Sequence, residues 1–192
     1  RCAGLIFVVL SLLPPVAGAQ QPFYTDDSAV TPKGKVHLEF SNEFDLLQRS
    51  AFPSLKQNTA SFELNYGLRD AVEVALECPL LAIWNARGTE PRTPFGIGDL
   101  MLSIKYNFRK EGEGLRGSAM GVSLNVELPT GDTRSQLGSG VADFSLNGIL
   151  QTSLTERTKW RTNGGVLFSG NTRTGVIGIR TRGLVMTGGA SL

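Results

Sequence analysis

Histidine and cysteine are scarce in this sequence, which limits the chemistry that the chain can perform. The 192 residues contain one histidine, His37, and two cysteines, Cys2 and Cys78. His37 and Glu39 lie on one face of an expected strand and could form half of an acid–base pair, but no nucleophile partner is identifiable. Two cysteines provide neither a disulfide framework nor a cysteine-rich metal site. We therefore expect no enzyme, no cofactor and no metal centre, and we interpret His37 as a polar lining residue.

Long apolar runs and helical periodicity are also lacking. No long stretch repeats its apolar residues at a helical period, and glycine is plentiful at 23 residues. The mean hydropathy is close to zero, which excludes a helical membrane protein, because its spans would make the mean strongly positive. Lysine and arginine total 19 against 17 aspartates and glutamates, and this balance gives no indication of nucleic-acid binding.

The first residues have the layout of a secretory signal peptide. Arg1 precedes an apolar run from Leu5 to Leu13 that is too short to span a bilayer, and small residues at 17–19 match a cleavage site. We expect residues 1–19 to be removed, and an internal buried strand is the alternative interpretation. Because no initiator methionine is present, we also expect the sequence to be truncated at its start. Residues 20–34 are polar and irregular, and we expect them to lead into the folded domain.

From residue 35 onward, apolar and polar residues alternate. Phe62, Leu64 and Tyr66 alternate with polar residues, and after Gly67–Asp70 the pattern resumes at Val72. Side chains on a strand point to opposite faces with period two, so these runs predict an antiparallel hairpin of amphipathic strands. The same unit recurs to the end of the chain. About eight strands are predicted: 35–47, two in the region 61–84, then 99–108, 120–128, 142–151, 160–169 and one that starts near 183.

The connections between these strands distinguish two kinds of all-β fold. In order they run long, short, long, intermediate, long, short, long, whereas a soluble barrel or sandwich predicts no such regularity. Transmembrane barrels have short periplasmic turns, long outer loops and strands of about 9–11 residues with aromatic residues near their ends. Trp84, Tyr106, Phe108 and Trp160 occupy such positions. We therefore predict an antiparallel up-and-down transmembrane β-barrel over residues 35–192 in a bacterial outer membrane.

Three short motifs carry a resemblance to a known family. They are Tyr66-Gly67-Leu68-Arg69-Asp70, then Gly96-Ile97-Gly98-Asp99-Leu100, then Leu128-Pro129-Thr130-Gly131-Asp132. With these motifs the sequence resembles the outer-membrane family of phenol-degradation meta-pathway transporters. The resemblance covers most of the mature chain and implies passive movement of small, aromatic or hydrophobic solutes. It also implies a barrel of about a dozen strands that ends in an aromatic residue. We therefore expect the chain to be truncated at its C-terminus as well.

The polar faces of the strands predict the lining of the lumen. An acidic lining would favour cations or neutral solutes, and a ladder of structural ion pairs that fills the lumen is the alternative. The alternative function is a structural or surface-interaction barrel with a filled lumen. A barrel enzyme is less favoured. The candidate lining residues are Lys35, His37, Glu39, Glu43, Glu63, Glu73, Glu77, Asp99, Lys105, Glu127 and Asp143.

The expected partners are outer-membrane lipid, lipopolysaccharide and a small solute. Arginines in the long loops could pair with lipopolysaccharide phosphates, and solvated loop charges are the alternative. These arginines are Arg87, Arg92, Arg134, Arg173, Arg180 and Arg182. On the strands, nine apolar residues should face lipid: Phe40, Phe62, Leu64, Val74, Leu76, Leu102, Ile104, Leu124 and Phe144. Glu39, Glu63, Glu73, Ser103, Asn125 and Asp143 should face the interior.

Overall fold

The computed structural model describes residues 25–46, 56–84, 86, 91–110, 112, 117–168 and 183–192. The expected signal peptide lies outside these residues, as do Arg87, Arg173, Arg180 and Arg182. Within them the chain is all β, and it holds no helix of the length and apolarity that a membrane crossing requires.

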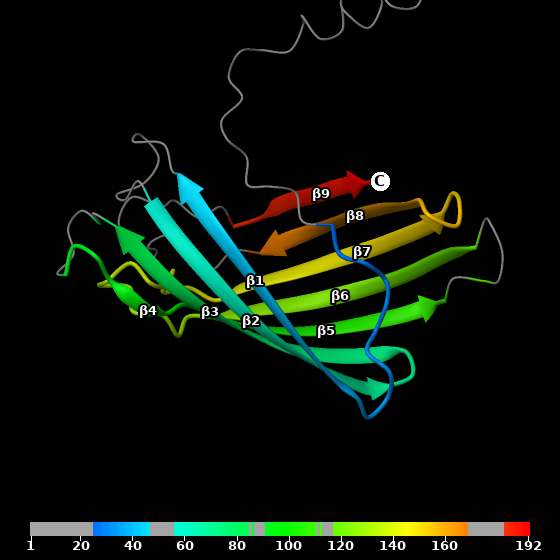
Figure 1. The fold of residues 1–192 in the computed structure, drawn as a ribbon, viewed down its shortest axis with the longest axis horizontal. Coiled ribbons are helices and arrows are strands. Elements are labelled where there is room, and N and C mark those ends of the chain that lie inside the picture. Colours follow the sequence, from blue (N-terminus) through cyan, green and yellow to red (C-terminus); the bar gives the residue numbers. More distant parts are fainter. Residues whose placement is uncertain are drawn as a thin grey trace, which may run out of the picture.

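Eight strands form one antiparallel up-and-down sheet, as the alternation predicts (Figure 1). Each strand pairs with its neighbour in the chain, apart from one short addition. That addition is β4 (Phe95–Ile97), which pairs with the end of β3 inside a region expected to be loop. The eight strands are β1 (Val36–Leu46), β2 (Lys56–Arg69), β3 (Val72–Trp84), β5 (Leu100–Arg109), β6 (Ser118–Leu128), β7 (Asp143–Ser153), β8 (Lys159–Phe168) and β9 (Val185–Ser191).

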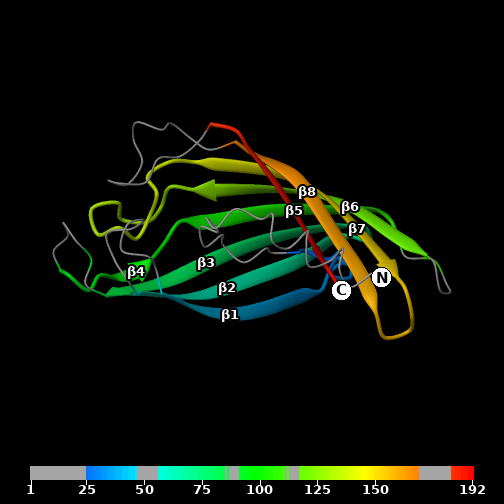
Figure 2. The ribbon, with the colours of Figure 1, turned by 90° about the horizontal axis from the view of Figure 1, so that it is seen from above.

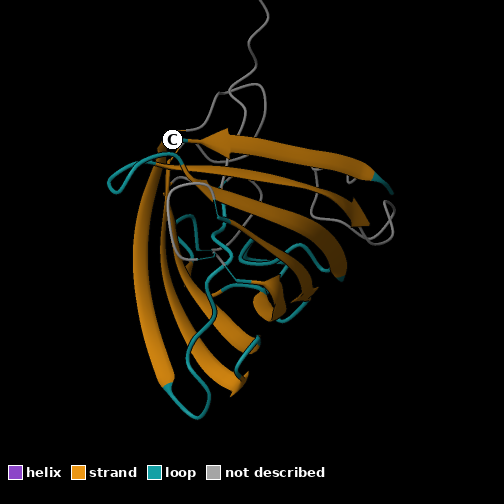
Figure 3. Cartoon of the chain, turned by 90° about the vertical axis from the view of Figure 1, so that its right-hand side faces the viewer, coloured by secondary structure: helices purple, strands orange, loops and turns teal. Residues whose placement is uncertain are grey.

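The sheet curls along its width into a half-barrel, with β1 and β9 at its two edges (Figures 2 and 3). The short connections 70–71 and 154–158 and the intermediate connection 110–117 all lie at one end of the strands, and the long connections lie at the other. We call these the turn end and the loop end. Seven of the eight strands have 10 to 14 residues, and β9 has 7. The predicted separation of short and long connections is therefore confirmed.

The register keeps like residues together across the whole sheet. One row of directly opposed residues runs through all eight strands and is apolar throughout, with Tyr66 its only side chain that carries a polar group. This row is Val36, Tyr66, Val74, Ile104, Leu124, Leu146, Val166 and Met186. A second apolar row runs through seven strands: Leu38, Leu64, Leu76, Leu102, Val126, Phe144 and Phe168. Because cross-strand pairs stabilise a sheet, these rows favour one register over its neighbours.

Burial in this sheet is the reverse of that in a water-soluble protein. The apolar rows lie on the convex face and are largely exposed, as is the neighbouring Phe40: the exposed fraction is 63% for Phe40 and 66% for Leu38. The buried side chains include polar residues of the concave face, such as Asn65, Glu73 and Ser123. Soluble monomers rarely expose apolar patches larger than a few hundred Å². The two faces therefore carry the residues predicted for them.

The convex face has aromatic residues toward both ends of the strands. Phe44 and Trp84 pack with ring centroids 5.9 Å apart at the loop end, and Tyr106 and Phe108 lie 6.2 Å apart at the turn end. All four are exposed. The two apolar rows lie between these pairs and consist mainly of aliphatic residues. This is the arrangement expected of aromatic girdles around an apolar band.

The end of β3 departs from strict alternation, and the structure gives the reason. Pairing of β3 with β5 stops at Glu77, and Gly98 donates its backbone N–H to the Pro79 carbonyl at 2.9 Å. The irregularity predicted at Pro79 is therefore present on the β5 side. Beyond it, Leu81 and Ile83 point to the concave side and pack against Leu137 of the loop 129–142.

The contact of Leu137 with β3 predicts that the loop 129–142 loosens when the Leu137 side chain is truncated. Leu137→Ala should loosen the loop, because truncating a buried leucine costs about 2–5 kcal/mol. The measurement is the rate of tryptic cleavage after Arg134, which should rise. Leu154→Ala, in an exposed turn, is the matched control and should leave that rate unchanged. Equal rates in the two variants would contradict the proposed packing.

Candidate functional site

The concave face is the part of the molecule where polar and charged side chains converge, and we call it the trough. Its residues are the polar half of each alternating strand, drawn together by the curl of the sheet (Figure 3). Asn65 is 2% exposed, Ser123 is 3% exposed and Glu73 is 6% exposed. Buried polar groups require partners, so the contacts inside the trough show what the face is built to hold.

A row of carboxylates crosses the trough and reaches its loop end at β6 and β7. In register, Glu39 opposes Glu63, Glu63 opposes Glu77, and on the far side of Met101 Glu127 opposes Asp143. We call these five residues the acidic row. Like charges directly opposite one another destabilise a sheet. Around Glu39, His37 Nδ1 lies 3.4 Å from the carboxylate Oε1, and Asn65 Nδ2 donates to the same oxygen at 3.4 Å.

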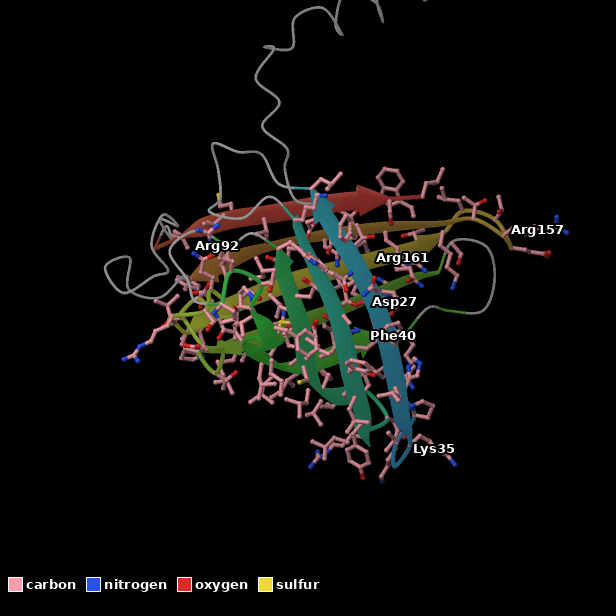
Figure 4. The ribbon with its side chains drawn as sticks, turned by 60° about the vertical axis from the view of Figure 1, so that its left-hand side comes forward. Asp27, Lys35, Phe40, Arg92, Arg157 and Arg161 are labelled. Carbon is pink, nitrogen blue, oxygen red and sulfur yellow. The ribbon has the colours of Figure 1, made fainter. Side chains whose placement is uncertain are left out.

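The positive charges of the trough lie closer to the turn end. Lys105 Nζ lies 3.7 Å from Glu73 Oε1 and 2.9 Å from Asp26 Oδ1. Further toward the turns, Arg161 Nε donates to Gln151 Oε1 at 3.2 Å. Figure 4 labels Arg161 within the curve of the sheet. The described cations of the trough therefore lie toward the turns, where Glu73 and Asp26 accompany Lys105, and the acidic row lies farther from the turns on β3, β6 and β7.

Residues 25–33 cross the trough as an extended segment, which we call the strap (blue in Figure 1). At one end, Thr25 Oγ1 lies 2.8 Å from Ser191 Oγ on β9, and Asn163 of β8 donates to the Asp26 carbonyl at 3.2 Å. In the middle, Asn107 Nδ2 of β5 donates to the carbonyl oxygen of Ser28. Ser28 is 2% exposed. The strap therefore reaches from one edge strand to the interior of the sheet.

The other end of the strap is fixed to β3 and β2. The backbone N–H of Thr31 donates to Glu73 Oε2 at 2.6 Å, and Gly34 N–H donates to the Gly67 carbonyl at 2.7 Å. A Cβ on Gly67 would overlap the Pro32 carbonyl oxygen, so this position has room only for glycine. Gly34 itself has φ of +73°, a conformation that favours glycine. The chain therefore turns at Gly34 from the strap into β1.

A second segment, the loop 129–142, folds over the loop end of the trough. Asp99 holds it: Gly131 N–H donates to Oδ1 at 2.9 Å, and Ser139 N–H donates to Oδ2 at 2.6 Å. Within the loop, Asp132 accepts from the Ser135 hydroxyl at 2.6 Å and from the Arg134 backbone N–H at 3.0 Å. These donors hold the pKa of the Asp132 carboxyl below its usual range. Asp99 is therefore an anchor of the loop as well as a candidate lining residue.

The structure brings together some of the predicted lining residues and separates others. Two groups form: the acidic row with His37 beside it, and Glu73 with Lys105 under the strap. Three residues stand apart. Lys35 lies exposed at the turn end, Glu43 lies toward the loop end of the edge strand β1, and Asp99 binds the loop. Of the loop arginines, Arg92 and Arg134 are described, and both are exposed. Arg92 lies at the end opposite Arg157 and Lys35 (Figure 4).

A pocket of about 390 Å³ opens between the strap and the turn end. Lys33 of the strap, Lys110 of the connection 110–117 and Lys159 of β8 line it, together with Asp70. Ala119, Val30 and Pro32 add apolar surface to its lining. The pocket shows that the strap lies across the trough without filling it completely at this end.

Sequence reasoning did not find the strap or its partners on the sheet. The sequence pattern places Asp26 and Pro32 in an irregular leading segment, and it makes Asn107 an ordinary polar position of its strand. The signal that was available is the polar face itself: asparagine, serine and glutamine on strands that bury this face need partners. Which segment supplies those partners is a tertiary question that alternation does not answer.

The described residues contain no group of three or more His, Cys, Asp or Glu side chains arranged to hold a metal ion. The ionisable neighbour of His37 on its own strand is Glu39, and the pair lies at the exposed edge of the sheet. Comparisons with family models, with curated proteins and with solved structures found no match. The site is therefore interpreted from its own geometry.

The strap predicts a strong effect of substitution at Gly67. Gly67→Val should displace the strap, because its Cβ would overlap the Pro32 and Thr31 carbonyl oxygens. The expected result is faster tryptic cleavage after Lys33. Gly164→Val is the matched control, since a Cβ at Gly164 meets no atom within 4 Å. A strap that stays equally protected in both variants would show that it does not depend on this contact.

Proposed function

We propose that the protein is an outer-membrane β-barrel channel that lets small solutes pass passively through a polar lumen. On this proposal, residues 1–19 direct export, the convex face lies in lipid, and the trough is part of the lumen wall. The resemblance noted above extends the proposal to small aromatic or hydrophobic solutes. Outer-membrane lipid and lipopolysaccharide are the proposed surroundings, and catalysis has no part in the proposed role.

The reversed burial is the observation that carries this proposal. Two apolar rows cover the convex face and remain exposed, while the concave face buries polar side chains. In a bilayer the same arrangement is favourable, because hydrocarbon accepts the convex face and backbone groups are paired within the sheet. The strand lengths, aromatic girdles and separation of short from long connections support the same proposal.

The acidic row supports a preference for cations or neutral solutes. A lumen wall that carries one sign of charge attracts counter-ions and repels ions of its own sign. Glu77 and Glu127 both oppose Met101 near the middle of the sheet, so a solute passing along the trough would meet their charges. The cations Lys105 and Arg161 lie nearer the turns, and the acidic row is therefore the proposed selectivity element.

Conductance in planar bilayers tests the channel and its selectivity. The full-length protein should conduct, and Glu77→Gln with Glu127→Gln should lower its cation-to-anion permeability ratio by about twofold or more. Glu156→Gln, in the exposed turn between β7 and β8, removes the same kind of charge outside the acidic row and is the control. Membranes that stay silent with correctly folded protein, when residues 25–33 are shown to be accessible to a water-soluble reagent, would overturn the channel proposal.

Adjacent residues on β5 test the membrane embedding. Leu102 lies on the convex face and Ser103 on the concave face. An arginine on the lipid face at mid-bilayer costs about 2–4 kcal/mol, whereas lumen positions tolerate charge. Leu102→Arg should therefore impair assembly far more than Ser103→Arg, measured as folded protein in the outer membrane. Single cysteines at both positions in a Cys78→Ser background provide the cross-check, and equal aqueous reactivity would contradict a membrane barrel.

A structural or interaction barrel with a filled interior is the second candidate function. The observation that favours it is the presence of two segments in the trough, the strap at the turn end and the loop 129–142 at the loop end. Such a barrel would present its outer loops to a surface partner and would not conduct. The bilayer measurement separates the two candidates, provided that the behaviour of the strap is measured as well.

A further inference from the structure

The strap is attached to the trough by contacts that differ in kind from those of an ordinary buried segment. It brings its own side-chain charge, Asp26, to Lys105, whose side chain is only 16% exposed. Lys105 also lies 3.7 Å from Glu73, so one ammonium group serves two carboxylates from different segments. Three hydrogen bonds to the strap backbone, and one between the hydroxyls of Thr25 and Ser191, add to this ion pair. The strap is therefore held mainly by polar contacts, whereas the loop 129–142 is also held by the apolar packing of Leu137.

The docked strap also leaves two buried acceptors without donors. Asn107 and Asn163 each donate an N–H to a strap carbonyl, and the Oδ1 atom of each side chain is buried without a hydrogen-bond partner. A buried, unsatisfied polar atom is unfavourable because it has lost its hydrogen bonds to water. These atoms would be solvated if the strap left the trough and water replaced it. The side chains of Asn107 and Asn163 therefore hold the docked strap with one atom and lower its stability with another.

We propose, on the basis of the channel function above, that residues 25–33 are a reversible plug that closes the lumen at its turn end. Lys105 holds the plug by pairing with Asp26 and neutralising Glu73. When this pairing is lost, Asp26 and Glu73 repel each other and the strap leaves, turning about Gly34. The pocket between the strap and the turn end gives the segment space in which to move. The plug is thus a gate whose closed state is the one described here.

The opening variant is Lys105→Met, which keeps most of the length of the side chain and removes its charge. Removing the ammonium group leaves the buried carboxylate of Glu73 without its cation, which is unfavourable, and leaves the part-exposed carboxylate of Asp26 without its hydrogen-bonded partner. We therefore expect conductance in planar bilayers to rise about tenfold or more over the unmodified protein. Lys56→Met, at the loop end on the convex side of β2, is the matched control and should leave conductance unchanged.

The locking variant is Thr25→Cys with Ser191→Cys in a Cys78→Ser background. The two hydroxyl oxygens are 2.8 Å apart, which brings the side chains close enough for a disulfide. Oxidation then pins the strap at both ends, because Gly34 continues into β1. Adding Lys105→Met to this protein should give no rise in conductance until a reductant is added. Thr25→Cys alone, treated identically, should show no effect of oxidant or reductant.

A thiol placed in the strap reports its position independently of conductance. Ser28→Cys should be protected from a water-soluble maleimide in the unmodified background and should react in the Lys105→Met background. Conductance and reactivity that rise together and are abolished by the disulfide support the plug. Full conductance in the oxidised, locked protein would overturn the plug and leave the channel standing. Maleimide labelling of the Ser28→Cys variant in folded but silent protein would overturn the channel proposal, and the plug with it.

Discussion

Register is the constraint on which the rest of this structure depends. Because side chains alternate with period two, a slip of one residue in any strand would move carboxylates such as Glu63 and Glu127 to the apolar face. The unbroken apolar row from Val36 to Met186 shows that all eight strands keep the same phase. The position of the strap depends on the same register, since Glu73 and Lys105 can hold the strap only from the concave side.

The acidic row is informative because it is unfavourable in isolation. Opposed carboxylates such as Glu63 and Glu77 repel one another, and the described cations of the trough lie closer to the turns. A dry, filled interior would make such a row costly, because charges removed from water need partners. A water-filled interior removes most of that cost. The row therefore favours a lumen that is wet at the level of the carboxylates, which agrees with a channel more than with a solid barrel.

The eight long strands, their order and the face of most of their side chains were predictable from the sequence, because alternation is a local property. The first hairpin and the separation of long from short connections followed in the same way, although β2 continues through Gly67 to Arg69 and the turn is at 70–71. Three features were not predictable: the short strand β4, the apolar concave patch at Leu81 and Ile83, and the strap. All three depend on residues distant in sequence. The weakened alternation at Leu81 and Ile83 was a visible signal, but its meaning required knowing that Leu137 packs there.

The two segments in the trough differ in what would remove them, and this difference bears on function. The loop 129–142 is held by a buried leucine and by backbone N–H groups donated to Asp99, and neither contact is weakened much by salt. The strap is held by an ion pair and by single hydrogen bonds next to unsatisfied acceptors. Because Coulomb interactions respond to ionic strength and to neighbouring charge, the strap is the segment that a solute or a change of surroundings would displace first. On the proposed function, the loop end is thus the fixed part of the lumen, and the turn end is the part that moves.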